Sequence, residues 1–158
     1  MNKMLKTLTA CAVLTFLMLT SVQAKEITFT TSLKNYAGEA AYFAIYLTDC
    51  NGAYQQTFWI GGKKSQYYKG LLDWAYGSKK RKAEYDGKTG ASLKSGRTFT
   101  IKATIDDALV DAGYQIRLDT AVERAKRGPS EVVVPLTSTD MGKPVVGTVY
   151  VQRFSYVF

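Results

Sequence analysis

An Asn-Gly pair between two runs of strand-forming residues constrains this fold more than any other feature. Residues 41–48 and 54–60 are rich in aromatic and β-branched side chains, and Asn51 and Gly52 lie between them. Asn-Gly readily adopts the positive φ angles of the tight turns that join antiparallel strands. The pattern therefore predicts a β-hairpin, whose first strand is apolar on both faces and suits the centre of a sandwich.

Most of the remaining chain also has strand character. Residues 27–33 alternate between apolar and polar side chains, which is typical of a half-buried strand. Further strands are expected at three β-rich segments and one long final run: residues 98–105, 113–120, 131–136 and 145–158. The turns between them predict an all-β protein, an antiparallel β-sandwich of the immunoglobulin or fibronectin type.

One region departs from the strand pattern. Within residues 67–76, helical spacing relates Leu71, Leu72, Ala75 and Tyr76, which predicts one short helix or a turn. Residues 78–97 are then polar, basic and glycine-containing, so we expect a long basic loop. A loop of this length in a compact domain is usually either functional or disordered.

The N-terminus has the three parts of a secretory signal peptide. Two lysines precede an uncharged apolar run, and small residues at the end of segment 1–24 form a cleavage site. The apolar run is too short to span a bilayer. We expect cleavage before Lys25 and export of one soluble domain, residues 25–158, to the periplasm.

The chain contains no histidine and only two cysteines. Ser-His-Asp and Cys-His nucleophile systems, imidazole metal ligands and thiolate zinc sites are therefore excluded. Cys11 fits the lipoprotein pattern by its letters, but it precedes most of the apolar run, so cleavage is favoured over lipidation. Cys50 has no partner for a disulfide in the exported domain, and we expect a small buried side chain in preference to a reactive thiol.

The formal net charge is +8. The basic run at residues 79–82 would suit an anionic membrane surface or an acidic partner, although such runs more often form a solvated loop. Nucleic acid is not an expected partner, because export removes the protein from it.

The segment DGKTGAS, residues 86–92, carries the chemistry that the sequence suggests. It resembles the recognition sequence of the FAD:protein FMN transferases, D-x-x-[S/T]-G-A-[T/S]. The resemblance implies that FMN is joined through its phosphate to the hydroxyl of Ser92, where the commoner form has threonine. It also implies that the transferase recognises Ser92 by four of the residues that precede it: Asp86, Thr89, Gly90 and Ala91. The alternative is a glycine-rich turn followed by an ordinary polar loop.

A second resemblance covers residues 42–124. YLTDCNG and FWIGG are followed by Leu71 and Trp74, then by the DGKTGAS segment, and then by GYQIRLDTAVER. These blocks resemble the predicted periplasmic proteins of the domain of unknown function 2271 family. Its members are often encoded with FMN transferases and PepSY-type membrane proteins. The resemblance therefore implies a periplasmic electron carrier with covalent FMN, an FMN transferase that loads it, and a PepSY-type membrane reductase as its electron donor.

Aromatic and basic side chains are the candidates for surrounding such a flavin. Trp74 is expected beside the flavin because it precedes the motif closely, whereas Trp59 is expected in the core. Positive charge around the phosphate would come from the basic run at residues 79–82 together with five further residues: Lys63, Lys64, Lys88, Lys94 and Arg97. The competing hypothesis is a cofactor-free β-sandwich that binds a partner or assists assembly in the cell envelope, for which Ser92 would be unimportant.

Overall fold

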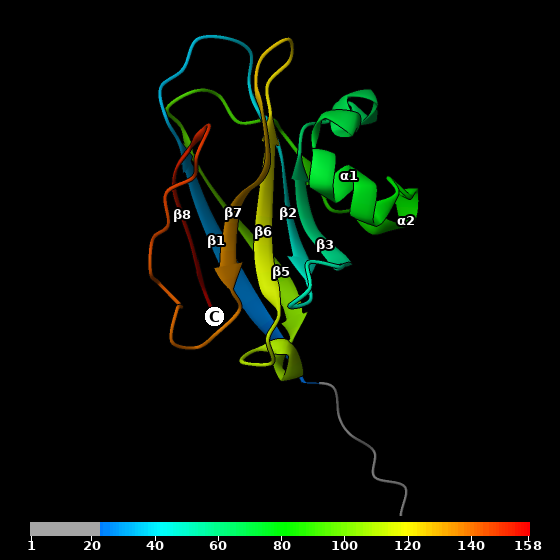
Figure 1. The fold of residues 1–158 in the computed structure, drawn as a ribbon, viewed down its shortest axis with the longest axis vertical. Coiled ribbons are helices and arrows are strands. Elements are labelled where there is room, and N and C mark those ends of the chain that lie inside the picture. The colour runs from blue at the N-terminus through cyan, green and yellow to red at the C-terminus, as the bar shows by residue number, and fades with distance from the viewer. Residues whose placement is uncertain (1–22) are drawn as a thin grey trace, which may run out of the picture.

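Two facing β-sheets make up most of the molecule. The computed structural model describes residues 23–158. A three-stranded sheet has the order β5–β1–β8, and a five-stranded sheet has the order β4–β3–β2–β6–β7 (Figure 1). The strands are β1 (Ala24–Leu33), β2 (Tyr42–Thr48), β3 (Tyr54–Gly61), β4 (Thr89–Gly90), β5 (Thr98–Asp106), β6 (Gln115–Ala121), β7 (Arg127–Pro135) and β8 (Val151–Val157). The prediction of a mostly β, sandwich-like protein is confirmed, while the immunoglobulin or fibronectin type stays a prediction.

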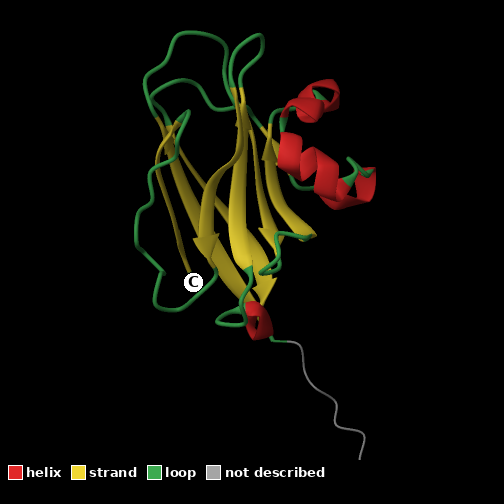
Figure 2. Ribbon diagram, in the orientation of Figure 1, coloured by secondary structure: helices red, strands yellow, loops and turns green. Residues whose placement is uncertain are grey.

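The helices are short and lie outside the sheets (Figure 2). They are the 3-10 helices η1 (Ser65–Gly70) and η2 (Asp107–Leu109) and the α-helices α1 (Leu72–Ser78) and α2 (Lys82–Tyr85). In the part of the chain that the structure describes, none of them is long and apolar enough to cross a membrane.

Strand β2 lies inside the five-stranded sheet and is buried on both faces. Phe43, Ile45 and Leu47 belong to the core between the two sheets. Ala44 and Tyr46 belong to a second core on the opposite face, together with side chains from η1 and α1. This arrangement explains why the strand carries apolar residues at consecutive positions rather than at alternate ones.

The β2–β3 hairpin turns at the predicted position. Gly52 has a φ of 82°, and its amide donates to the Asp49 carbonyl at 3.0 Å. The Asp49 carboxylate accepts from the amides of Asn51 and Ala53, both at 2.9 Å. Cys50 lies in this turn and is exposed, so the expectation of a buried thiol is wrong. Its side chain is at the tip of a hairpin, outside both cores.

The region between β3 and β5 is more ordered than the sequence indicates. One short helix was expected within residues 67–76, and the structure has η1 followed by α1. The expected long loop contains α2 and the short strand β4, which pairs in parallel with β3. The intervening helices form the crossover that a parallel pair requires. The sandwich is therefore antiparallel except for this pair, within residues 23–158.

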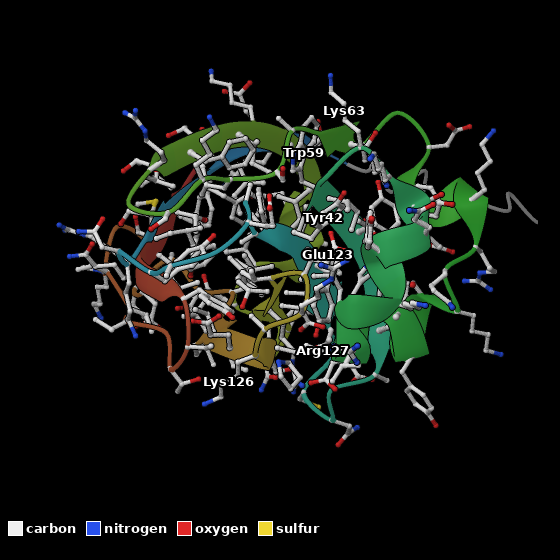
Figure 3. All side chains as sticks on the ribbon, turned by 90° about the horizontal axis from the view of Figure 1, so that it is seen from above. Tyr42, Trp59, Lys63, Glu123, Lys126 and Arg127 are labelled. Atoms are coloured by element: carbon white, nitrogen blue, oxygen red, sulfur yellow. The ribbon has the colours of Figure 1, made fainter. Side chains whose placement is uncertain are left out.

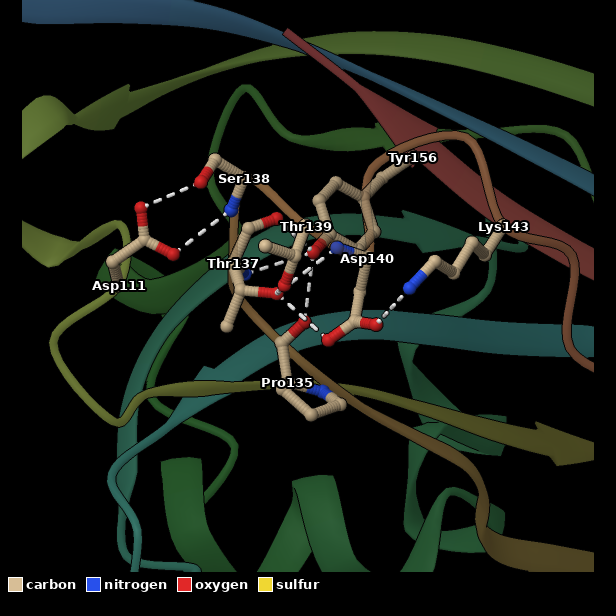
Figure 4. Close-up of polar contacts among 8 residues, drawn as sticks. All are labelled: Asp111, Pro135, Thr137, Ser138, Thr139, Asp140, Lys143 and Tyr156. Atoms are coloured by element: carbon tan, nitrogen blue, oxygen red, sulfur yellow. Dashed lines mark hydrogen bonds and ion pairs between the residues drawn. The ribbon is translucent and has the colours of Figure 1, made fainter.

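The final predicted strand, residues 145–158, is wrong in its first half. Val145 and Phe154 pair as an isolated antiparallel bridge, so the chain reverses between them. Only Val151–Val157 forms the strand β8. Figure 4 shows how the connection before it is fixed: the Tyr156 hydroxyl contacts the Pro135 and Thr137 carbonyls, both at 2.8 Å.

The expected signal peptide, residues 1–24, lies almost entirely outside the described residues. Strand β1 begins at Ala24, and the expected new N-terminus, Lys25, forms an ion pair with Asp107 at 2.6 Å. A chain that begins at Lys25 therefore keeps nearly all of β1.

Candidate functional site

The segment 86–92 lies along the outer edge of β3. The amides of Ile60 and Gly62 donate to the carbonyls of Lys88 and Gly90, at 2.9 and 2.8 Å. Immediately after the segment, Leu93 exchanges two backbone hydrogen bonds with Ala41, at 2.8 and 2.9 Å. Ala91 and Ser92 thus connect two fixed points, the pairing of Gly90 with β3 and the bridge between Leu93 and Ala41.

The beginning of the segment is held by a turn. Helix α2 ends with the Asp86 amide donating to the Lys82 carbonyl at 2.9 Å, and Gly87 follows with a φ of 72°. The Lys88 ammonium donates to the Thr57 carbonyl at 3.0 Å, which fastens the segment to β3 a second time. The Asp86 carboxylate is left exposed beside this turn.

The side chains of the segment are accessible. Asp86, Thr89 and Ala91 are exposed, and Gly90 and Ser92 are half-buried. Within residues 23–158 the Ser92 hydroxyl forms no hydrogen bond, unlike the nearby Ser95 hydroxyl, which accepts from the Tyr36 amide at 2.7 Å. Ser92 therefore offers a hydroxyl that no neighbour occupies, on a segment whose backbone is fixed.

Trp59, and not Trp74, is the tryptophan beside the segment. A Cβ atom on Gly90 would lie 2.5 Å from the Trp59 ring, so Gly90 admits that ring against the backbone. Trp59 is half-buried, packs against Phe99 with ring centroids 6.3 Å apart, and has an indole N–H without a partner among the described residues. It borders a cavity of about 260 Å³ that Lys88 and Lys102 also line.

Trp74 cannot stack on a ligand in this structure. Its side chain is 0% exposed, and its indole N–H donates to the Thr57 hydroxyl at 2.9 Å. The expectation that Trp74 adjoins the flavin is therefore wrong. It relied on separation along the chain, whereas cross-strand register brings Trp59 to the segment.

Basic side chains surround the segment without being neutralised. Lys63, Lys64, Lys94 and Arg97 are exposed, and Lys88 is half-buried. None of the ion pairs found within residues 23–158 involves them. Figure 3 looks down on this end of the sandwich and shows Lys63 pointing outward beyond Trp59.

A buried carboxylate that sequence reasoning missed lies under α1. Asp119 is 0% exposed and accepts from the Tyr46 hydroxyl at 2.9 Å and from the Trp74 and Ser130 amides at 2.9 and 2.8 Å. Burial raises the pKa of Asp119, although the three hydrogen-bond donors oppose that shift. The pKa of Tyr46 is also raised, first by its own burial and then by the charge of the adjacent Asp119. One side chain thereby joins β6 to β2, α1 and β7. An acidic residue inside the buried run Leu118–Thr120 is the signal that would have revealed it.

A second buried carboxylate, Glu131, holds the chain before β8. It accepts from the amides of Val149, Tyr150 and Val151, at 2.9, 2.5 and 2.6 Å, and from the Thr120 hydroxyl. All of its partners belong to the fold, which indicates a structural role.

Comparison with known proteins gives one family. The family model described as "Predicted periplasmic protein (DUF2271)" matches residues 24–153. No curated protein and no solved structure matches the chain. The matched range begins at the start of β1, includes segment 86–92, and ends within β8.

Proposed function

This chain belongs to the DUF2271 family of predicted periplasmic proteins, and on that premise we propose that it is a periplasmic electron carrier with FMN covalently attached to Ser92. The observation that carries the proposal is the segment 86–92. Its sequence resembles the recognition sequence of the FMN transferases, and its acceptor hydroxyl is reachable and free of hydrogen bonds within residues 23–158.

The attachment needs only a hydroxyl from this protein. The transferase breaks the pyrophosphate bond of FAD, the Ser92 oxygen forms the new bond to the FMN phosphorus, AMP leaves, and the hydroxyl proton is released. The resulting phosphodiester carries one negative charge. The nearby Lys88 and Lys94 favour that charge electrostatically.

The residues of the segment 86–92 fit an FMN group attached to Ser92. Gly90 keeps the backbone flat against Trp59, because any side chain there would collide with the indole. The half-buried Trp59 ring lines the cavity that Lys88 also borders, and an aromatic ring system attached at the segment could pack there. Bound FMN would supply one- and two-electron redox chemistry, and the protein would supply its placement.

The proposed partners follow from the family resemblance. An FMN transferase loads Ser92 after the signal peptide has delivered the chain to the periplasm, and a PepSY-type membrane reductase donates the electrons. The exposed basic residues 79–82 lie on the surface between α1 and α2, where an anionic membrane could attract them.

The test is coexpression with an FMN transferase. Wild-type protein should show ultraviolet flavin fluorescence after denaturing electrophoresis and a mass increase that corresponds to FMN. Ser92→Ala should show neither, and Ser92→Thr should retain both, since a hydroxyl remains. Ser95→Ala is the matched control, a nearby serine outside the segment, and it should be labelled like the wild type.

Asp86→Ala should lower the yield of labelled protein, because the transferase reads that position. If the wild type stays dark while a known acceptor is labelled in the same cells, the carrier proposal fails. The cofactor-free binding module then takes its place.

A further inference from the structure

A groove in the described structure lies between α1 and the β2–β3 hairpin. It has a volume of about 730 Å³. The hairpin contributes Gly52 and Tyr54, α1 and the residue after it contribute Tyr76 and Lys79, and Arg117 of β6 also lines the groove. The hairpin turn is at the opposite end of β3 from Gly62 and the segment 86–92, so this groove is separate from the proposed flavin site.

Arg117 lacks the partner that a half-buried guanidinium usually has. Its two terminal nitrogens donate to the Gln115 side-chain oxygen at 2.9 Å and to the Ser130 hydroxyl at 3.3 Å. Its Nε is buried without an acceptor, and no carboxylate of residues 23–158 lies within 4.0 Å of it. A guanidinium has five N–H donors in a planar fork that matches an oxyanion, so unused donors remain here.

The backbone around the guanidinium is shaped to hold it at this position. A Cβ on Gly52 would lie 2.8 Å from a terminal nitrogen of Arg117, so the hairpin turn packs directly on the guanidinium. Gly77 likewise admits Tyr54, because a Cβ there would lie 2.5 Å from the Cβ of that tyrosine. Two glycines thus allow α1 and the hairpin to enclose the groove from both sides.

The charge of the groove favours an anion. Lys79 follows α1 with a φ of 53° and adds a second positive charge to that of Arg117. Asp73 is the opposing carboxylate, and it already accepts from the Ser130 hydroxyl at 2.6 Å. The Tyr46 hydroxyl on the groove lining donates to Asp119, so it does not compete for the guanidinium.

The walls of the groove are aromatic. Tyr54 is half-buried, and its ring centroid lies 6.3 Å from that of Tyr46, which is fully buried behind it. Tyr76 is 89% exposed at the rim, where it contributes little to the core of the fold. We propose that this groove binds a small aromatic oxyanion, a planar ring that carries a carboxylate or a phosphate monoester. The oxyanion pairs with Arg117 and Lys79, and the ring lies against Tyr54 and Tyr76.

The proposal does not depend on flavin at Ser92, so it is tested on protein expressed without a transferase. Benzoate and phenyl phosphate are titrated in separate arms and followed by amide chemical shifts. Benzamide serves as the neutral analogue, and inorganic phosphate as the anion without a ring. One or both aromatic anions should produce saturable chemical-shift changes in the hairpin and α1. The anion that binds more tightly shows whether the groove prefers a carboxylate or a phosphate monoester. Benzamide and inorganic phosphate should bind at least about tenfold more weakly.

Variants place the binding in this groove. Arg117→Gln should weaken binding of the aromatic anion by about tenfold or more. Lys79→Gln and Tyr76→Ala change exposed side chains, so they leave the fold intact, and each should weaken binding several-fold. Arg153→Gln on β8 is the control and should bind like the wild type. The proposal is overturned if neither aromatic anion binds, if benzamide binds equally well, or if Lys79→Gln and Tyr76→Ala leave the affinity unchanged.

Discussion

Replacement of Asp119 by alanine should destabilise the protein more than loss of any exposed polar side chain. The carboxylate accepts three hydrogen bonds in a fully buried position, from the Tyr46 hydroxyl and from the Trp74 and Ser130 amides. Asp119→Ala leaves the Trp74 and Ser130 amides without this acceptor and the Tyr46 hydroxyl with only a long contact to the Ser130 hydroxyl, at 3.4 Å. Because these donors belong to β2, α1 and β7, the loss loosens the contact between α1 and the sheet.

The magnitude follows from the donors that are left unpaired. Each buried unsatisfied donor costs about 1–3 kcal/mol, which gives at most about 9 kcal/mol for three. Water can enter the space left by the side chain, and the cost of burying a carboxylate is removed, so the expected loss is about 3–5 kcal/mol. For a domain of this size, that corresponds to a fall in Tm of about 10–15 °C.

Urea unfolding followed by circular dichroism measures this loss, with Asp73→Ala as the control. Asp73 is exposed and accepts only the Ser130 hydroxyl, so its removal should cost less than about 1 kcal/mol. A double-mutant cycle of Asp119→Ala with Tyr46→Phe should give a coupling of about 1–2 kcal/mol. A loss below about 1 kcal/mol for Asp119→Ala, or strict additivity in the cycle, would refute the reasoning.

Three further predictions concern single side chains. Burial raises the folded-state pKa of Asp119 above its ordinary value of 3.8, so its contribution to stability is full below that value and is lost as pH rises through the raised pKa. As the pH falls from 7 to about 4, the urea midpoint of the wild type should therefore rise relative to the midpoint of Asp119→Asn. A fall of the wild-type midpoint relative to that variant would contradict this. Gly90→Val should place its side chain against Trp59, cost about 1–3 kcal/mol and shift the tryptophan fluorescence. Gly142→Val also strains the backbone, at a φ of 77°, but its Cβ meets nothing, so it should leave that fluorescence unchanged. Cys50 should react with a thiol reagent such as Ellman's reagent in the native state as fast as in urea, and a thiol that reacts only after unfolding would show that it is not exposed.

The sequence predicts the parts of the fold that depend on neighbouring residues. The turn at Gly52 and the two apolar faces of β2 were both evident, because the residue types at neighbouring positions indicate a turn and a buried strand. The parallel strand β4 was not, since its two residues are paired by a strand some thirty positions earlier. The reversal between Val145 and Phe154 was also missed, because alternation reports burial and not the pairing partner.

The candidate site shows the same division. The segment 86–92, which we propose as the acceptor, could be singled out from its residues alone. Its aromatic neighbour could not, because proximity along the chain favoured Trp74 and cross-strand register places Trp59 there. Arg117 gave little sign of its role, since the groove that it lines is formed by the hairpin and α1. Asp119 was marked only by its acidic side chain within the buried run Leu118–Thr120.

The position of β4 links the proposed modification to the tendency of the protein to self-associate. An uncovered strand edge is a template on which another chain can add, and β4 is the element that covers the end of β3. A transferase that drew residues 86–92 away from the sheet would free the amides of Ile60 and Gly62 for such pairing. Loading is therefore safest when the segment is modified in place, with the exposed Asp86 and Thr89 contacted on the surface and only Ala91 and Ser92 entering the active site of the transferase.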